Sequence, residues 1–333
     1  MSIFVIILNW NGKNDTIECL ESLQKVSVPH QVIIVDNGST DDSIASFKGD
    51  FSSATLLENK ENLGYAEGNN VGIRYALKKG ASHLLILNND TTVDPFFLDA
   101  LLKSNSDILG AKPLLYGDHT RLDHLGGLWN SKKGVFDLVG CREKEECWNS
   151  PQPLDYVCGC ALFAKAEVFK KIGLFEPRFF LFWEESDWCA RARAAGYQPY
   201  FCPQAKLYHK VSASFTGGKA HTTYFWWRNR LFWIERNCSK QEKWRLYLKT
   251  LVPEIAHLLK LYPLKSLQLF LLNHFKPKEL QNERRERLRN YKAALSGIKD
   301  YLLRRFGNGP SWIFKNQNNL VQSRQSVIKS KKR

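Results

Sequence analysis

The residues that could do chemistry lie where runs of apolar residues end. Three such runs are followed at once by amide, hydroxyl or carboxylate side chains, in Asn9-Trp10-Asn11-Gly12, Asp36-Asn37-Gly38-Ser39 and Asn88-Asn89-Asp90. Ligands of open α/β sheets bind beyond the carboxyl ends of the strands, so these groups are expected to meet in one crevice. One polar strand end could be an ordinary turn. Three in one sheet favour a binding site.

These groups suit a nucleotide. The carboxylate of Asp36 can accept a hydrogen bond from the ring N–H of uracil or thymine. Gly38 and Ser39 are small enough for the backbone to lie close to a flat ring. The segment from Asn62 to Asn70 leads into a helix, where backbone N–H groups can meet phosphate.

Two residues could hold a metal ion. Asp90 directly follows an apolar run and is placed to bind Mg²⁺ or Mn²⁺ through oxygen. His209 offers an imidazole nitrogen, although a structural histidine is an equally good interpretation. Cys158 and Cys160 form a lone CxC pair without further ligand pairs, and we interpret them as core thiols beside an acceptor pocket.

A second group of acids lies in Phe182-Trp183-Glu184-Glu185-Ser186-Asp187-Trp188. Adjacent carboxylates between aromatic residues are costly unless a cation, the helix dipole or a reaction uses them. Either Glu184 or Glu185 is therefore a candidate general base, and Asp187 belongs to the same candidate catalytic group. Arg191 and Arg193 could pair with Glu184 or Asp187 along a helix surface.

Alternating elements position these groups. The pattern of apolar residues predicts helices between successive strands and after the last strand. This alternation of strands and helices predicts a mostly parallel sheet with helices on both faces. The strands are expected at Ile3–Leu8, Gln31–Val35, Ala54–Leu57 and Leu84–Leu87, and the helices at Asp15–Leu23, Asp41–Phe47, Glu67–Lys79 and, later in the chain, Asp187–Ala195. Residues 105–150 are less regular and could form an acceptor-side insertion.

The C-terminal part is basic. Of the formal net charge of +15, residues 276–333 supply +12, from 16 Lys and Arg against 4 Asp and Glu. Without a nucleic-acid-binding module, an anionic membrane surface is the expected partner rather than nucleic acid. The Trp- and Arg-rich run 224–233 could be ordinary core, but together with the amphipathic stretch from Trp244 it also suits peripheral membrane contact.

Neither a signal peptide nor a membrane-spanning stretch is recognisable. Eight cysteines without a CxxC pair are expected to be reduced thiols. These features predict a cytoplasmic protein at the inner face of the cell membrane.

Longer segments make a resemblance specific. VIILNWNG, VIIVDNGSTDDS, ENLGYAEGNN, LLILNNDTTVDP, the stretch from Val157 to Tyr197 and the later His209 resemble glycosyltransferase family 2, in its rhamnosyltransferase-like branch, over residues 1–235. The resemblance implies a GT-A fold, an inverting single displacement and a divalent metal, Mg²⁺ or Mn²⁺, on the diphosphate of a nucleotide-sugar donor.

Carried over by position, the resemblance implies a role for each matching residue. Asp36 matches the nucleobase-binding aspartate, Asp90 the last acid of the DxD metal motif, and Glu185 the general base. His209 matches a histidine that joins metal or diphosphate binding in some relatives. The expected donor-binding set is Asn9, Asn11, Asp36, Gly38, Ser39, Asn62, Gly64, Asn69 and Asn89.

Two positions depart from the family pattern. The metal motif holds one carboxylate, in Asn88-Asn89-Asp90, and the base is Glu185 where Asp is commoner, so Glu184 could take that role instead. We expect a transferase domain at 1–235, with a nucleotide half at 1–104 and a catalytic half at 105–235, a helical extension at 236–310 and a basic tail at 311–333.

The resulting hypothesis is transfer of rhamnose or a similar hexose from a UDP- or dTDP-sugar to a lipid-linked saccharide or polysaccharide. A nucleotidyltransferase is a rival, but the first loop lacks its Gly-rich, basic character. A degenerate, non-catalytic membrane module is a second rival, against which Glu184 and Glu185 argue. A nicotinamide dehydrogenase is the weakest, because no GxGxxG follows the first strand.

Overall fold

The computed structural model describes residues 1–211, 219–272 and 278–314. The strands of these residues form a nine-stranded sheet in the order β3-β2-β1-β4-β11-β6-β12-β5, with β7 beside β6, and a small sheet in the order β10-β8-β9. The bounds are β1 Ile3–Asn9, β2 Gln31–Asp36, β3 Thr55–Glu58, β4 His83–Asn88, β5 Thr91–Val93, β6 Ile108–Leu115, β7 Asp118–Leu122, β8 Gly126–Asn130, β9 Val135–Val139, β10 Tyr156–Val157, β11 Ala161–Lys165 and β12 Pro199–His209.

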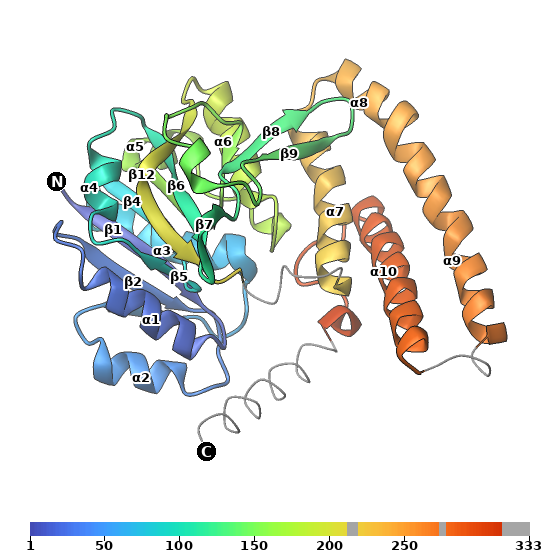
Figure 1. Ribbon diagram of the computed structural model, residues 1–333, viewed down its shortest axis with the longest axis horizontal. Helices are drawn as coiled ribbons and strands as arrows, with labels where there is room; N and C mark the ends of the chain where they lie inside the picture. The colour runs from blue at the N-terminus through green and yellow to red at the C-terminus, as the bar shows by residue number, and fades with distance from the viewer. Residues whose placement is uncertain (212–218, 273–277, 315–333) are drawn as a thin grey trace.

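Helices cover the large sheet and then form a separate layer at the C-terminal side (Figure 1). Their bounds are α1 Lys13–Leu23, α2 Ser43–Asp50, α3 Gly64–Lys78, α4 Phe97–Leu102, α5 Ala166–Ile172, α6 Glu184–Ala194, α7 Ala220–Asn237, α8 Lys240–Leu246, α9 Val252–Leu272 and α10 Lys278–Leu302.

The first four strands along the chain, β1 to β4, are parallel to one another, as predicted. Successive side chains of a strand point to opposite faces, and both faces of β1 are buried. Phe4 and Ile6 pack in the core that includes α3, whereas Val5 and Ile7 pack in the core that includes α1 and α4. The prediction of helices on both faces is therefore confirmed.

The second half of the sheet is mixed. Strand β11 runs antiparallel to β4 and β6, and β12 runs parallel to β6 but antiparallel to β5. Residues 105–150, expected to be an irregular insertion, contribute β6 and β7 to the large sheet and β8 and β9 to the small one. The nucleotide half is thus wholly parallel, whereas the second half combines the parallel β6–β12 pair with antiparallel neighbours.

The aromatic run 224–233 is core. It lies in α7, where Phe225 is fully buried and Trp233 only 4% exposed, and Arg228 and Arg230 are fully buried as well. Arg230 donates from Nη1 to Glu254 at 2.6 Å and from Nε to the carbonyl of Gly134 at 2.9 Å. The interpretation of this run as a membrane-facing surface is wrong, because burial in the protein already removes these rings from water.

The C-terminal helices form one packed layer with α7. A Cβ atom on Gly297 of α10 would lie 2.4 Å from the carbonyl oxygen of Tyr224, so the two backbones touch. The expected boundary at residue 235 therefore falls inside α7, which packs against the predicted extension. Among the described residues, the helices are all too short or too polar to cross a membrane.

Candidate active site

The nucleotide-side residues meet at the carboxyl ends of β1 and β2. Asn9 and Asp36 are register partners in the parallel pair, and both are fully buried. Asn9 donates from Nδ2 to Oδ1 of Asp36 at 2.8 Å and to Oγ of Ser39 at 3.0 Å. The backbone N–H of Ser39 donates to Oδ2 of Asp36 at 2.9 Å. The carboxylate is thus held in place by both strands, and it retains further acceptor sites for a ligand.

The neighbouring loops are tied to this pair. Exposed Asn11 accepts from the backbone N–H of Thr40 at 2.7 Å. Gly38 has φ +73, and a Cβ there would lie 2.7 Å from Cα of Glu61, so glycine is required by conformation and by space. Asn62 caps the entry to α3 by accepting from the backbone N–H of Gly64 at 2.8 Å.

Two other predicted donor residues lie deeper. Asn69 is buried in α3 and donates to the carbonyl of Tyr65 at 2.9 Å. Asn89 donates to Oγ1 of Thr16 at 2.9 Å, beside Gly12. Both side chains have clear structural partners in the fold, so a direct donor contact remains a prediction for each of them.

The predicted metal ligands face each other. Nε2 of His209 lies 3.3 Å from Oδ1 of Asp90, and both residues are buried. Nδ1 of His209 lies 2.9 Å from Oδ2 of Asp123, which fixes the orientation of the ring. Metal-binding histidines usually donate a hydrogen bond from their other ring nitrogen to a carboxylate, as His209 can to Asp123. The residues present therefore fit a divalent cation.

Electrostatics support this fit. Burial alone would lower the pKa of His209, but hydrogen bonding to Asp123 and Asp90 outweighs it and raises the pKa to about 10. The carboxylates of Asp90 and Asp123 therefore stabilise a positive charge beside them. A bound divalent cation can provide that charge in place of the proton on His209.

The two glutamates begin α6 after a strained approach. Phe180, Phe182 and Trp183 have positive φ angles of 64°, 67° and 76°. Such backbone conformations in residues other than glycine cost free energy and concentrate at functional sites. They turn the chain so that Glu184 is buried and Glu185 is partly exposed.

The pKa values of both glutamates are raised. Burial is the largest cause for each, and the charge of Glu185 raises the pKa of Glu184 further, to well above its usual value. The pKa of Glu185 is about 7, because backbone N–H groups at the helix start and His124 partly oppose the burial. The carboxylate of Glu185 lies against Gly159, where an added Cβ would be 3.1 Å from Oε1. Glu185 is the less buried residue of the pair, and its role as the base remains a prediction.

Helix α7 holds the strained segment in place. Nδ2 of Asn229 donates to the carbonyl oxygens of Phe179, Leu181 and Phe182 at 2.9, 2.8 and 2.9 Å. Arg228 donates from Nη2 to the carbonyl of Phe179 at 2.8 Å. Both side chains are fully buried.

Asp187, predicted in the same catalytic group, has other partners. Its carboxylate is fully buried and pairs with Arg191 at 3.0 Å and Arg236 at 2.8 Å. Asn237 donates to it at 3.0 Å. These contacts join α6 to α7, and a catalytic role for Asp187 remains a prediction.

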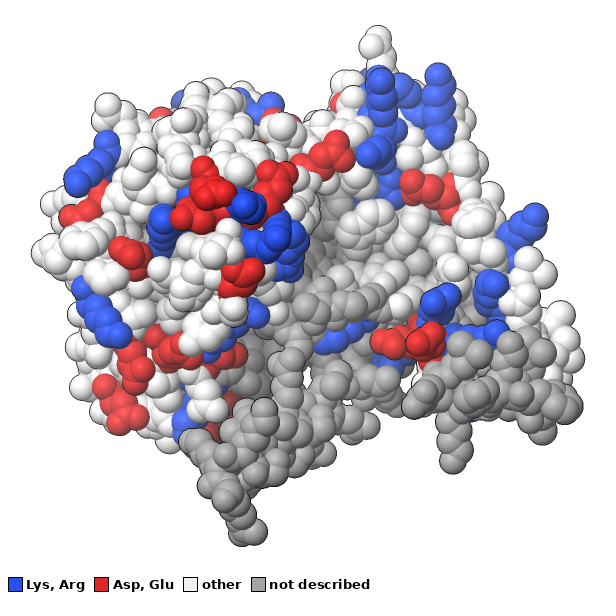
Figure 2. All heavy atoms as spheres, viewed as in Figure 1, with Lys and Arg blue, Asp and Glu red and all other residues white. Residues whose placement is uncertain are grey.

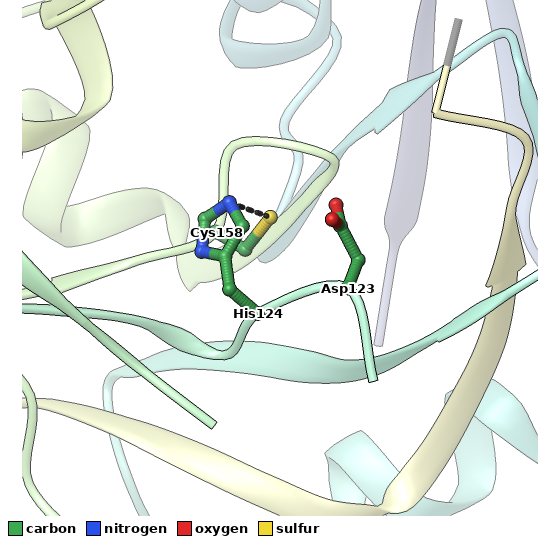
Figure 3. A group of neighbouring side chains, drawn as sticks. All are labelled: Asp123, His124 and Cys158. Carbon is green, nitrogen blue, oxygen red and sulfur yellow. Dashed lines mark hydrogen bonds between the residues drawn. The ribbon is translucent and has the colours of Figure 1, made fainter. Parts of the chain in front are cut away.

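Cys158 and His124 form a thiol–imidazole pair (Figure 3), and their charges act on the pKa of nearby Glu185. Sγ of Cys158 is 3.5 Å from Nε2 of His124 and 3.3 Å from Sγ of Cys160. Hydrogen bonding with Cys160, helped by His124, holds the pKa of Cys158 well below its usual value. The charge of Cys158 raises the pKa of His124 to about 9, against the effect of burial. Both thiols are buried in the core, as expected, and Cys158 also contacts His124.

Several site residues were missed by sequence reasoning. The hydroxyl oxygen of Tyr65 lies 2.9 Å from Oδ1 of Asn88, to which it can donate a hydrogen bond. It also lies 2.9 Å from the carbonyl oxygen of Gly159. Tyr65 stands in the quoted motif between Gly64 and Asn69, which could have drawn attention to it. Asp123 and His124 lie in a segment without periodicity, and Asn229 donates to backbone carbonyls distant in the sequence, so none of the three had a local signal.

A mixed sheet whose first half is Rossmann-like, with acids and amides gathered at the carboxyl ends of its strands, is the GT-A fold that the chain shares with solved glycosyltransferases. The sequence profile described as Glycosyl transferase family 2 matches residues 4–173, and the chain belongs to that family.

Its relatives include rhamnosyltransferases. The chain is 24% identical over 216 residues to dTDP-rhamnosyl transferase RfbF of Shigella flexneri, covering 63% of this chain and 69% of that protein. It is 25% identical over 249 residues to the N-acetylglucosaminyl-diphospho-decaprenol L-rhamnosyltransferase of Mycobacterium tuberculosis, covering 62% and 80%. Among solved structures, a mannosyltransferase from Pyrobaculum calidifontis with GDP-Man and Mn²⁺ is similar in fold, with a TM-score of 0.52, 15% identity, and 90% and 86% coverage.

Proposed function

We propose that this glycosyltransferase moves rhamnose or a similar hexose from a UDP- or dTDP-sugar to a lipid-linked saccharide, with inversion at the anomeric carbon. The observation that carries the mechanism is Glu185, a residue less buried than Glu184 at the start of α6, whose pKa burial raises to about 7. A base is most effective when its pKa is close to the working pH.

The reaction needs one protein base. The acceptor oxygen attacks the anomeric carbon, its proton passes to Glu185, and the bond from that carbon to the diphosphate breaks with the electron pair on the diphosphate. Asp90 and His209 would hold a divalent cation, which offsets the charge of the leaving diphosphate. Burial and the charge of Glu185 raise the pKa of Glu184 well above its usual value, which favours the neutral acid and so reduces the charge that the base faces.

The donor assignment is based on the nucleotide half and the relatives. Asn9 and Ser39 orient Asp36, whose remaining acceptor sites suit the ring N–H of a pyrimidine. The Shigella relative is named for dTDP-rhamnose transfer, which agrees with a pyrimidine nucleotide.

The acceptor assignment is based on a relative and on a surface. The mycobacterial relative is named for an acceptor on a decaprenyl diphosphate. Helix α9 exposes apolar side chains at helical spacing, namely Val252, Leu259, Leu264, Leu267, Phe270 and Leu271. Blue side chains gather where α8 and the start of α9 lie, at the upper right of Figure 2. An exposed apolar helix flanked by cations suits a membrane surface, where such acceptors reside.

Paired substitutions test the base. Glu185→Gln keeps the size of the side chain but cannot take a proton, so turnover at saturating donor should fall by roughly two to four powers of ten. Glu184→Gln is the matched control, because an amide resembles the protonated acid, and it should cost much less. Calorimetric donor binding should be nearly unchanged in both.

If Glu184→Gln abolishes turnover and Glu185→Gln does not, the two roles are exchanged. If neither variant loses turnover, the single-displacement mechanism drawn here is wrong.

A further inference from the structure

A set of soft and borderline metal ligands adjoins the Asp90–His209 pair, because one of its members, Asp123, contacts His209. It consists of the thiols of Cys158 and Cys160, the imidazole of His124 and the carboxylate of Asp123. One ligand atom each from Asp123, His124 and Cys158 lies within 4.8 Å of the others. Figure 3 shows the sulfur of Cys158 between the imidazole ring and the carboxylate.

The distances match a metal site. Zinc–sulfur and zinc–nitrogen bonds of about 2.3 and 2.05 Å at tetrahedral angles place the two ligand atoms about 3.5 Å apart. Sγ of Cys158 lies 3.5 Å from Nε2 of His124. Two zinc-bound sulfurs lie about 3.8 Å apart. The sulfurs of Cys158 and Cys160 lie 3.3 Å apart and would need to separate only slightly.

The ligands also come from well-held parts of the fold. Asp123 and His124 directly follow β7, Cys158 directly follows β10, and Cys160 directly precedes β11. Both thiols are buried, whereas His124 is partly exposed, so the set of ligands borders solvent at His124. Nδ1 of His124 is buried without a hydrogen-bond partner among the described residues, so the environment does not satisfy this ring as a purely structural histidine.

We propose that Cys158, Cys160, His124 and Asp123 form a second metal site, selective for a thiophilic divalent cation of the Zn²⁺ type. Thiolate and imidazole ligands favour Zn²⁺, whereas Mg²⁺ and Mn²⁺ prefer oxygen. The site is thereby chemically distinct from the predicted donor-side site.

A bound cation would join two parts of the active site. Asp123 orients His209 at 2.9 Å, and Gly159 between the two cysteines lies against the carboxylate of Glu185. The cation would therefore link the segment behind the predicted metal ligand to the loop beside the predicted base. Because it binds the folded state, it should also stabilise the protein by mass action.

Metal binding can be measured without any assay of activity. The full, untagged chain is reduced with a phosphine and freed of metal, with exposed Cys141 and Cys147 changed to Ser to remove adventitious ligands. Zn²⁺ is then titrated against a chromogenic chelator, with thermal unfolding followed in parallel. We expect one Zn²⁺ per chain, a higher Tm, and a thiolate-to-metal charge-transfer band when Co²⁺ replaces Zn²⁺.

Variants in the same background decide which residues bind. Cys158→Ser and His124→Gln should each weaken Zn²⁺ binding more than about tenfold, since even second-shell changes cost that much. Cys202→Ser, another buried cysteine in a different part of the sheet, should bind like the parent. His124→Gln is the informative variant if Cys158→Ser fails to fold, because its side chain is partly exposed.

Failure of the parent to compete for Zn²⁺ would overturn the proposal, as would equal binding by His124→Gln.

Discussion

Nδ2 of Asn229 donates a hydrogen bond to the carbonyl oxygen of Phe182 at 2.9 Å, two residues before Glu184. The same nitrogen also reaches the carbonyls of Phe179 and Leu181. A residue of α7 thus holds the conformation that presents the candidate base, although it lies far from Glu185 in the sequence. We regard Asn229 as a positioning residue.

Asn229→Ala should lower turnover by about tenfold or more while leaving the affinity for the nucleotide donor unchanged. Its loss leaves buried carbonyls without their donor, at a cost of roughly 1–3 kcal/mol. Steady-state kinetics and donor calorimetry give the two quantities. Asn237→Ala is the control on the same helix, since Asn237 contacts Asp187 and not this segment. Equal losses of turnover in both variants would mean that general destabilisation, and not positioning, is responsible.

The raised pKa of Glu185 predicts the pH dependence of the reaction. The base must be deprotonated to act, so kcat/KM should rise with pH and level off above about 7, the pKa of Glu185. The activity is lost as the pH falls through that value, well above the range where an ordinary glutamate titrates. Initial rates between about pH 5.5 and 9 give the profile, and a profile that stays level down to pH 5.5 would contradict this assignment of the base.

Asp36→Asn should weaken binding of UDP- and dTDP-sugars by about 10- to 100-fold, the range for losing a charged hydrogen-bond acceptor. Asparagine is the better substitution than alanine, because Asp36 is fully buried and accepts from Asn9 and Ser39. Calorimetry with pyrimidine and purine nucleotide sugars measures the preference. Wild-type affinity for a GDP-sugar equal to that for UDP- and dTDP-sugars would refute the pyrimidine assignment.

Phe270→Ser should reduce binding to anionic liposomes, because Phe270 is 78% exposed on α9 and has apolar neighbours along the helix. Phe96→Ser is the matched control, since Phe96 is 71% exposed on the opposite, sheet-bearing part. Co-sedimentation across a salt series separates the apolar contribution from the electrostatic one. Truncation after Phe314, which removes six basic residues and no acidic ones, tests the tail. Liposome binding that is unchanged by both alterations would exclude the proposed membrane surface.

Local patterns predicted the nucleotide half well. The β-branched run Ile3–Leu8 is β1 within one residue, and Glu67–Lys79 and Asp187–Ala195 correspond to α3 and α6 within three residues. Parallel strands place their carboxyl ends at one edge, so the meeting of Asn9 with Asp36 followed from the alternation itself.

The catalytic half was harder to predict, because its order comes from distant partners. Strand β12 pairs with β6, about ninety residues earlier in the chain, and no local pattern specifies that choice. The same holds for the aromatic run of α7, whose rings are buried by α10 and not by lipid. His124 and Cys158 lie thirty-four residues apart and meet only through the pairing of β8 with β10.

The hydrogen bond from Arg228 to the carbonyl of Gly307 at 2.6 Å has a consequence for synthesis on the ribosome. Arg228 also holds the carbonyl of Phe179, so the segment before Glu184 is secured by a residue that is itself secured near the end of the chain. Domains form from the N-terminus as the polypeptide emerges. The nucleotide half can therefore fold early on the nascent chain, whereas the base reaches its final setting only once residue 307 has left the exit tunnel. A prematurely terminated product would keep the nucleotide-binding half without a correctly placed base.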